Sequence, residues 1–385
     1  MCHARGGPVT VSMFAGFLED CDDTVVELSK LSIADSDHEV TILEKFHESA
    51  RVTSARDYVL RRCNQTDLLL FDECYPERLL KNCRKIGEGV YGEVFLWRAP
   101  DGFARVMKIV PIAGDIKVNG EQQKDYHEII SEIVIAMLNS VTVLTVRTVY
   151  GTYPSRLLDL WELFDEIKGS ENDNPASLPA HQQYVVLELA NAGQDLESYQ
   201  FTGAEQAYAL FLQVAFGLAV AEEAHQFEHR DLHWGNVLIA VPIRHIYATF
   251  VLRGRLRRVP RGGVAATIID YSLSRVALGG ASRPGEVALY NDLANDESLF
   301  AAVGDRQFEV YRLMREKLGN DWKSFEPYTN ILWLHYVVDK MITAVRYQRT
   351  TSKAHKQHIA KLKGVRDRIL SYGSAAQFVL TDNEY

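Results

Sequence analysis

The sequence has few cysteines and no sign of a disulfide framework. Its five cysteines are an odd number, contain no C-x-x-C pair, and all fall within the first 83 of 385 residues. We therefore expect free thiols in a reducing compartment. A zinc site built from Cys63, Cys74, Cys83 and a nearby histidine is the alternative, but these spacings are not typical of zinc ligands.

A secretory signal and a membrane-spanning run are also missing. The N-terminal residues contain no basic stretch followed by an apolar one. The longest apolar run, residues 207–221, is interrupted by Gln213 and is too short to cross a bilayer. We expect a cytoplasmic or nuclear protein with no membrane partner.

The composition is that of an ordinary globular protein. Hydrophobic residues make up 47% and charged residues 24%, which supports a sizeable core and argues against global disorder. The length suffices for two modest domains, or for one two-lobed domain with an extension. The formal net charge of −9 argues against general polyanion binding and suits a basic partner or substrate.

The most informative stretch is EHRDLHWGNVL, residues 228–238. It places Asp231 and Asn236 five residues apart. In phosphoryl-transfer enzymes, an aspartate in this pattern accepts the proton of an attacking hydroxyl, and the following asparagine holds Mg²⁺. The stretch therefore indicates the catalytic loop of a protein kinase, and residues 207–225 before it predict an apolar helix.

A glycine pattern lies upstream of this loop. Residues 85–95 read KIGEGVYGEVF, with glycines at 87, 89 and 92. The flanking β-branched and aromatic residues predict two strands joined by a hairpin, whereas the dinucleotide-binding version of the motif opens a helix. Glycines allow the backbone to lie close over ATP phosphates, although the motif alone is a weak indication.

A lysine follows in a short apolar strand. Lys108 lies sixteen residues after Gly92 and could by itself be a solvated edge residue; in this position it fits the lysine that contacts the α- and β-phosphates. Its partner is expected on the helix predicted over residues 124–139, where Glu128 and Glu132 lie one turn apart. We favour Glu132, nearer the middle of the helix, and interpret Glu128 as a solvated acid.

The next strand carries the expected hinge. Residues 181–190 predict a buried strand, which the tripeptide N-A-G interrupts. Backbone groups around Ala190 and Ala192 are expected to bind adenine, with Leu189 limiting the depth of the pocket. The polar stretch 169–179, just before the strand, is interpreted as a surface loop.

An aspartate then closes an apolar strand, 39 residues after Asp231. Asp270 matches the metal-binding aspartate of the D-F-G signature, but Tyr271 stands for the phenylalanine and Ser272 for the glycine. No A-P-E sequence follows, so the usual activation segment is absent.

These motifs occur in the order found in protein kinases. We predict an α+β, two-lobed protein-kinase-like fold: an extension, residues 1–80, packing on the N-terminal lobe; that lobe and the hinge, residues 81–193; and a larger helical C-terminal lobe, residues 194–385. The predicted catalytic residues are Asp231, Lys108, Glu132, Asn236 and Asp270, of which Asn236 and Asp270 would hold Mg²⁺. The residues predicted to contact ATP are Gly87, Gly89, Gly92, Val94, Val106, Lys108, Leu189, Ala190, Ala192, Leu238 and Ile269.

Where the sequence departs from the usual kinase pattern, it resembles the haspin family. Members are atypical eukaryotic kinases with a D-Y-[ST] triplet, no A-P-E and a catalytic loop like HRDLHWGNVL. The stretches IIDYSLSR, QFEVYRLM and ILWLHYVVDKM, which begin at residues 268, 307 and 331, are also similar to haspin. The resemblance covers residues 80 to 345.

The resemblance implies a substrate and a cellular setting. It implies an ATP- and Mg-dependent serine/threonine kinase, here expected as a monomer, that phosphorylates the third-position threonine of the histone three tail in mitosis, in the nucleus and on chromosomes and also in the cytoplasm. In the family, acids after the hinge and a catalytic-loop histidine contact the tail; Asp195, Glu197 and His233 match them. Asp305 matches a further acid, whereas Val303 stands where another would be expected.

Other interpretations stay open. Ser272 and the missing A-P-E suit a pseudokinase scaffold or chromatin-binding module, although every catalytic position is intact. A small-molecule kinase of the same fold is a third option. The five arginines of residues 253–261 are most simply a solvated hairpin tip, but could contact nucleosomal DNA. Because the usual activation segment is missing, we expect the kinase to be active without phosphorylation of its own activation loop.

Overall fold

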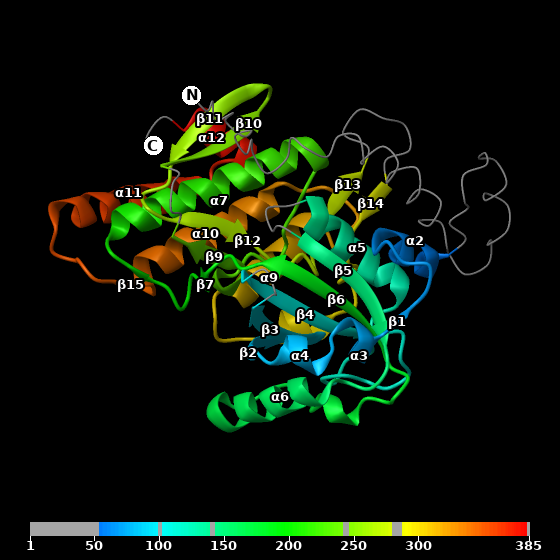
Figure 1. The fold of residues 1–385 in the computed structure, drawn as a ribbon. Helices are drawn as coiled ribbons and strands as arrows, with labels where there is room; N and C mark the ends of the chain where they lie inside the picture. Colours follow the sequence, from blue (N-terminus) through cyan, green and yellow to red (C-terminus); the bar gives the residue numbers. More distant parts are fainter. Residues whose placement is uncertain (1–53, 99–101, 139–142, 242–245, 279–286, 383–385) are drawn as a thin grey trace, which may run out of the picture. The chain divides into compact units, whose positions relative to one another are not determined.

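The computed structural model describes residues 54–98, 102–138, 143–241, 246–278 and 287–382. These residues form two compact units, an N-terminal lobe that ends at Ala192 and a C-terminal lobe that begins at Gly193. The N-terminal lobe is rich in strands and the C-terminal lobe is mainly helical (Figure 1), so the predicted α+β, two-lobed fold is confirmed. The part of the predicted extension before residue 54 lies outside the described residues.

The N-terminal lobe is built on a six-stranded sheet in the order β1-β5-β6-β4-β3-β2, antiparallel except for the parallel pair β1 and β5. Its strands are β1 (Leu69–Leu70), β2 (Cys83–Gly89), β3 (Gly92–Arg98), β4 (Ala104–Ile112), β5 (Val143–Tyr150) and β6 (Gln183–Ala190). Its helices are α2 (Ala55–Arg62), α3 (Phe71–Cys74), α4 (Glu77–Leu80), α5 (Tyr126–Leu138), α6 (Ser155–Lys168) and the 3₁₀ turn η1 (Pro175–Ser177).

One face of this sheet packs on the hydrophobic core. Successive side chains along β3 and β4 point to opposite faces of the sheet, and those on the core face include Phe95 and Met107. They belong to the same core cluster as Leu157 and Leu160 of the amphipathic helix α6. Residues 71–83 supply further core side chains, among them Phe71. The chain before β2 is therefore part of this lobe's core. Figure 1 shows α5 and α6 on opposite faces of the sheet.

The C-terminal lobe surrounds helix α7 (Ala204–His225), against which helices α10, α11 and α12 pack. The other helices are η2 (Trp234–Asn236), α8 (Glu297–Ala301), α9 (Gln307–Leu318), α10 (Tyr328–Thr343), α11 (Lys353–Ile369) and α12 (Ala375–Thr381). Its strands are β7 (Gln194–Asp195), β8 (Gln200–Phe201), β9 (Val237–Ala240), β10 (Tyr247–Leu252), β11 (Arg255–Pro260), β12 (Ala265–Ile268), β13 (Val276–Leu278), β14 (Val287–Leu289) and β15 (Arg346–Tyr347).

Helix α7 is apolar on nearly all sides because it is the central helix of its lobe. By length and composition it could cross a membrane, but 83% of its most apolar window is buried inside the lobe. It ends at His225, and the left-handed backbone of the following residue, Gln226 (φ +46°, ψ +48°), stops the helix and leads into the predicted catalytic loop.

Candidate active site

The strand lysine is held by a helix glutamate within the N-terminal lobe. Lys108 Nζ lies 2.6 Å from Glu132 Oε1, and Lys124 Nζ lies 3.4 Å from the other oxygen of the same carboxylate. Glu132 is buried on α5, whereas Glu128 is exposed in the first turn, where it accepts a hydrogen bond from the backbone N–H of Asp125. Glu132, and not Glu128, is therefore the partner of Lys108, and its carboxylate is held by two lysines.

Register places several predicted nucleotide contacts on one face of the sheet. Lys108 pairs with Val94 on β3, and Val106 pairs with Leu189 on β6. Since side chains alternate along a strand, these four lie on the face opposite the hydrophobic core. All four are half-buried. Ala190 ends the same strand. This face therefore presents a cation among apolar side chains.

The predicted glycine hairpin is formed by β2 and β3. Gly89 pairs with Gly92, which leaves a two-residue tip at Val90 and Tyr91. A Cβ atom on Gly92 would lie 2.1 Å from the carbonyl oxygen of Ile109, so only glycine fits there. At Gly87 and Gly89 a Cβ atom would meet nothing within 4 Å, which leaves the backbone open to close approach.

In the C-terminal lobe, Asp231 is held by two side chains. Tyr311 Oη on α9 donates a short hydrogen bond to Asp231 Oδ1. Asn236 Nδ2 donates to the backbone carbonyl of Asp231 at 2.8 Å and to Oδ2 at 3.4 Å, which leaves the amide oxygen of Asn236 for another ligand. The backbone N–H of Ile269 donates to the carbonyl of Asn236 at 3.0 Å and joins this loop to the end of β12.

Electrostatics at this centre reflect two neighbouring carboxylates. Burial, and then the charge of Asp270, raise the pKa of Asp231 to about 8. Asp270 adopts a left-handed backbone (φ +58°), and its Oδ1 accepts the N–H of Ser272 at 3.1 Å. Aspartate tolerates this conformation better than most residues, because its short side chain can bond locally.

Tyr271 and His229 tie the two aspartate segments together. The Tyr271 ring packs 5.6 Å from the His229 ring, and its hydroxyl donates to the carbonyl of Ile268 at 2.6 Å. His229 Nε2 lies 3.0 Å from the carbonyl oxygen of Ile269, and its Nδ1 accepts the N–H of Asp231 at 3.2 Å. Burial lowers the pKa of His229 to about 4, so the ring is neutral near pH 7. Tyrosine therefore fills the phenylalanine position with its hydroxyl satisfied.

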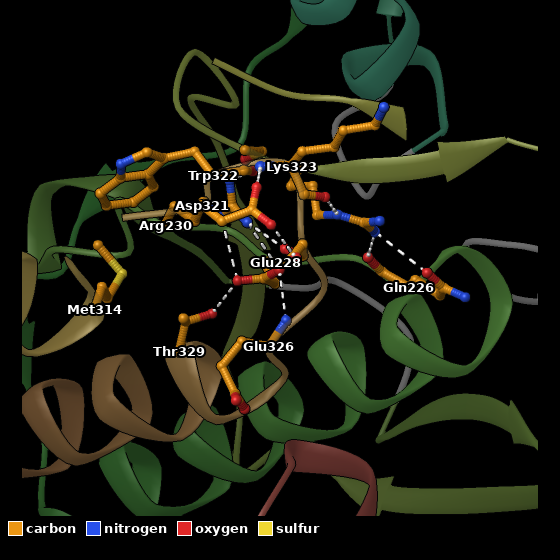
Figure 2. A network of polar contacts seen from close by, with 12 residues as sticks. Gln226, Glu228, Arg230, Met314, Asp321, Trp322, Lys323, Glu326 and Thr329 are labelled. Atoms are coloured by element: carbon orange, nitrogen blue, oxygen red, sulfur yellow. Dashed lines mark hydrogen bonds and ion pairs between the residues drawn. The ribbon is translucent and has the colours of Figure 1, made fainter. Parts of the chain in front are cut away.

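Arg230, which directly precedes Asp231, is held by contacts inside the C-terminal lobe (Figure 2). Arg230 is fully buried, and its Nη2 lies 2.9 Å from Glu228 Oε1. Its Nη1 donates to the carbonyl of Trp322 at 2.6 Å, and Nη2 also donates to the carbonyl of Ser324 at 3.0 Å. Glu228 also accepts a hydrogen bond from Thr329 Oγ1 at 2.7 Å. This network offsets the cost of the left-handed backbone at Arg230 (φ +64°), which is about 1 kcal/mol or more.

Three of the four residues predicted to contact the substrate lie around Tyr336 and the catalytic loop. The charge of Asp305 acts on both Tyr336 and His233, and the charge of Glu197 acts on Tyr336. Asp305 forms an ion pair with Lys340. The lysine partly neutralises this acid, a pairing that the sequence did not predict.

Of the other residues singled out in the sequence, Asp195, Leu238 and Val303 lie in the C-terminal lobe and Ala192 lies in the N-terminal lobe. Asp195 uses Oδ1 to accept the N–H of Ser198 at 2.7 Å and so shapes the segment after the hinge. Val303, in place of the expected acid, is 81% exposed. Leu238 is half-buried on β9, opposite Asp195. Ala192, at the end of the N-terminal lobe, is half-buried.

The donor set fits a divalent metal. Asn236 and Asp270 offer an amide and a carboxylate oxygen, the ligand types that Mg²⁺ prefers. Asp270 also raises the pKa of Asp231 through like charge, and a cation held at Asp270 would relieve that repulsion. Cys63, Cys74 and Cys83 form no disulfide, and among the described residues they do not come together as a group of potential metal ligands.

Tyr311 lies in the stretch QFEVYRLM, but nothing in the sequence indicates its contact with Asp231. The hydrogen bond from Tyr311 to Asp231 joins residues 80 positions apart. A tyrosine flanked by helix-forming residues is most simply a core residue, and Tyr311 does pack on Trp333 at 5.4 Å. The polar use of its hydroxyl had no local signal.

These features together define a protein-kinase domain. A strand lysine is paired with a helix glutamate, and a loop with an aspartate and an asparagine is hydrogen-bonded to the end of the strand that precedes a second aspartate. A family model described as Haspin like kinase domain matches residues 37–377. The chain therefore belongs to the haspin kinase family.

Named relatives agree with this placement. The chain is 40% identical over 338 residues to "Serine/threonine-protein kinase haspin homolog" of Drosophila melanogaster, covering 83% of this chain and 58% of that protein. It is 35% identical over 354 residues to "Serine/threonine-protein kinase haspin" of Mus musculus, covering 88% and 46%. The corresponding Arabidopsis thaliana homolog is 37% identical over 325 residues, covering 80% and 50%. The chain spans about half the length of these relatives.

Proposed function

We propose that this protein is an ATP- and Mg²⁺-dependent serine/threonine kinase that phosphorylates the third-position threonine of the histone three tail in mitosis. The observation that carries the proposal is the arrangement at Asp231, whose carboxylate is oriented by Tyr311 and Asn236 next to a second carboxylate suited to a metal. Membership of the haspin family supports it.

The chain's own residues would act by positioning and by charge. Lys108, oriented by Glu132, neutralises the phosphates of the nucleotide, and Asp231 accepts the proton of the substrate hydroxyl. Tyr311 bonds Asp231 Oδ1, whereas Asn236 Nδ2 is 3.4 Å from Oδ2; we therefore propose Oδ2, the less tightly bonded oxygen, as the one that receives the proton. Mg²⁺, held by Asn236 and Asp270, would supply charge stabilisation of the transferred phosphoryl group.

Recognition of a cationic tail would rest on a small acidic surface. Glu197 is exposed. The negative charge of Asp305 acts to raise the pKa of both His233 and Tyr336. The ion pair with Lys340 and the exposed Val303 reduce the negative charge of this surface. Charge complementarity here would favour encounter rate and register more than affinity, and we infer weaker selection for basic flanking residues than a fully acidic groove would give.

Activity without loop phosphorylation is part of the proposal. An arginine in the position of Arg230 could bind a phosphate, but its donors already contact Glu228 and two backbone carbonyls in a fully buried network. A phosphate would have to displace a buried carboxylate, which is costly. Phosphatase-treated protein should therefore retain its rate, and loss of activity on treatment would contradict this point.

The deciding experiment is phosphate transfer from Mg²⁺-ATP to a histone three tail peptide. It is compared with the same peptide carrying alanine at its third position, and Asp231→Asn serves as the inactive control. Transfer that requires both the threonine and Asp231 supports the proposal. ATP binding without transfer would favour a pseudokinase scaffold or a different basic substrate.

Contact with nucleosomal DNA is a further part of the proposal. The hairpin β10–β11 exposes Arg255, Arg257 and Arg258, which form no ion pair within the described ranges, while Arg253 contacts Glu223 at 2.7 Å. Replacing the three exposed arginines by serine should weaken nucleosome binding and flatten its salt dependence, with unchanged transfer to the free tail peptide. Equal nucleosome binding by the variant would refute the contact. Such a contact suits a nuclear, chromosome-associated enzyme.

A further inference from the structure

Two asparagine side chains hold the tip of the glycine hairpin by its carbonyl groups. Asn172 Nδ2 donates to the carbonyl of Gly89 at 3.1 Å and to that of Gly92 at 3.4 Å. Asn119 Nδ2 donates to the carbonyl of Val90 at 2.9 Å. Asn119 and Asn172 come from two different loops, and together we call them the asparagine clamp.

The two loops are joined to each other and to the hairpin. The N–H of Asn119 donates to Asp173 Oδ2 at 2.8 Å, and the N–H of Asp173 donates to Asn119 Oδ1 at 2.7 Å. The carboxylate of Glu88, on the hairpin, accepts a hydrogen bond from the Ser170 hydroxyl at 2.7 Å and another from the backbone N–H of Glu171 at 2.8 Å. The stretch that the sequence marked only as a polar surface loop thus supports the hairpin at several points.

Buried charges anchor the clamp. Lys85, whose side chain is fully buried, lies 2.8 Å from Glu93 Oε2 and also pairs with Glu88. Asn172 Nδ2 donates to the other oxygen of Glu93 at 2.8 Å. Phe164 of α6 covers the Lys85 ammonium at 4.1 Å. Breaking a buried charge network is costly, so the hydrogen bond to Glu93 fixes the Asn172 side chain in place.

The clamp acts from the face of the sheet opposite Lys108. Glu93 pairs with Ile109, one residue along from the pair of Val94 and Lys108, so the two pairs point to opposite faces. The described peptide bonds are trans. In a trans peptide the N–H points opposite to the C=O of the same plane. Carbonyls turned toward the clamp therefore turn the N–H groups of Val90 and Tyr91 away from it.

We propose that Asn172 is a positioning residue for the nucleotide: by holding the hairpin carbonyls, the asparagine clamp presets the tip N–H groups to receive the phosphates of ATP. This rests on the proposed kinase function. It assigns a role to a loop that touches none of the predicted catalytic side chains. Adenosine, which has no phosphates, should not sense the clamp.

The test compares nucleotide affinities of the full chain. Asn172→Ala should raise the Kd for Mg²⁺-ATP about tenfold, the size expected for one or two lost hydrogen bonds, and leave the Kd for adenosine within about twofold. Asn174→Ala is the matched control, since Asn174 caps η1 through the N–H of Ala176 at 2.9 Å and, within the described residues, its side chain forms no hydrogen bond with the hairpin. Its affinities should match those of the wild type.

Two results would overturn the proposal. Equal weakening of ATP and adenosine would indicate general damage to the lobe, and an unchanged Kd for ATP would show that the clamp does no positioning. Hydrogen exchange over residues 86–95, measured without nucleotide, should be faster in Asn172→Ala than in Asn174→Ala, and equal rates would also overturn it. Because exchange needs no ligand, a wild type that binds no Mg²⁺-ATP would refute the proposed function separately.

Discussion

Replacing Tyr311 by phenylalanine isolates one hydrogen bond to the carboxylate of Asp231, the proposed catalytic base. The ring and its packing on Trp333 are kept, and only the hydroxyl that donates to Asp231 Oδ1 is lost. The remaining side-chain donor, Asn236 Nδ2, is 3.4 Å from Oδ2 and too far to fix the carboxylate alone. The rotation of the Asp231 side chain should therefore become less restricted.

The expected loss is large enough to measure. A hydrogen bond to a charged group contributes about 1.5–3 kcal/mol, which corresponds to a tenfold to hundredfold fall in kcat. The KM for ATP should change little, because within the described residues the hydroxyl of Tyr311 bonds Asp231, and its ring packs on Phe308 and Trp333, none of which is assigned to the nucleotide. Steady-state kinetics on the tail peptide, with kcat and KM determined separately, provide the assay.

Tyr328→Phe is the matched control. Tyr328 lies in the same lobe, and its hydroxyl donates to the carbonyl of Leu370 at 3.2 Å. Its kinetics should equal those of the wild type. The reasoning is refuted if Tyr311→Phe keeps kcat within about twofold of the wild type. A faster Tyr311→Phe would also refute it, since the tyrosine would then compete with the substrate for the base.

Three further predictions concern the charged groups. Glu132→Gln removes the carboxylate charge that orients the strand lysine and should raise the KM for ATP severalfold in a kinase assay, whereas Glu128→Gln, on the exposed first turn, should not. Glu228→Ala leaves Arg230 buried without its carboxylate and should lower the free energy of unfolding by about 3–5 kcal/mol in denaturant titration; a loss under about 1 kcal/mol would contradict the network. Burial raises the pKa of Glu222 from its ordinary 4.5 to about 7, so the folded state holds the proton more tightly than the unfolded chain. The resulting stabilisation of the folded state is complete below pH 4.5 and is lost as the pH rises from there through 7. Between pH 5 and 8 the free energy of unfolding of the wild type should fall by about 2–3 kcal/mol more than that of Glu222→Gln, and parallel pH curves would exclude the shift.

Local patterns predicted the elements of the fold well. The stretch 207–225 was expected to be a helix and lies within α7, and the glycine pattern gave the β2–β3 hairpin. The choice of Glu132 over Glu128 rested on helix position alone, and the structure places the ion pair with Lys108 there. These predictions succeed because periodicity, turn residues and motif spacing act within a few residues of the chain.

Contacts between distant polar residues were not predictable in this way. Asn172 reads as one polar residue of a loop, and Lys340 as a solvated helix residue, yet one holds the glycine hairpin and the other neutralises Asp305. Many donors in the chain could satisfy each acceptor, and the sequence carries no local signal for which one does.

The order of the motifs, the secondary structure around them and the family can be recognised from the amino-acid sequence, because each depends on short stretches of neighbouring residues. How the Asp231 carboxylate and the glycine hairpin are held is visible only in the folded protein. Tyr311 and Asp231 are 80 residues apart, and Asn172 and Gly89 are 83 apart. Their hydrogen bonds form only after burial has excluded water and packing has brought one donor, out of many, within reach.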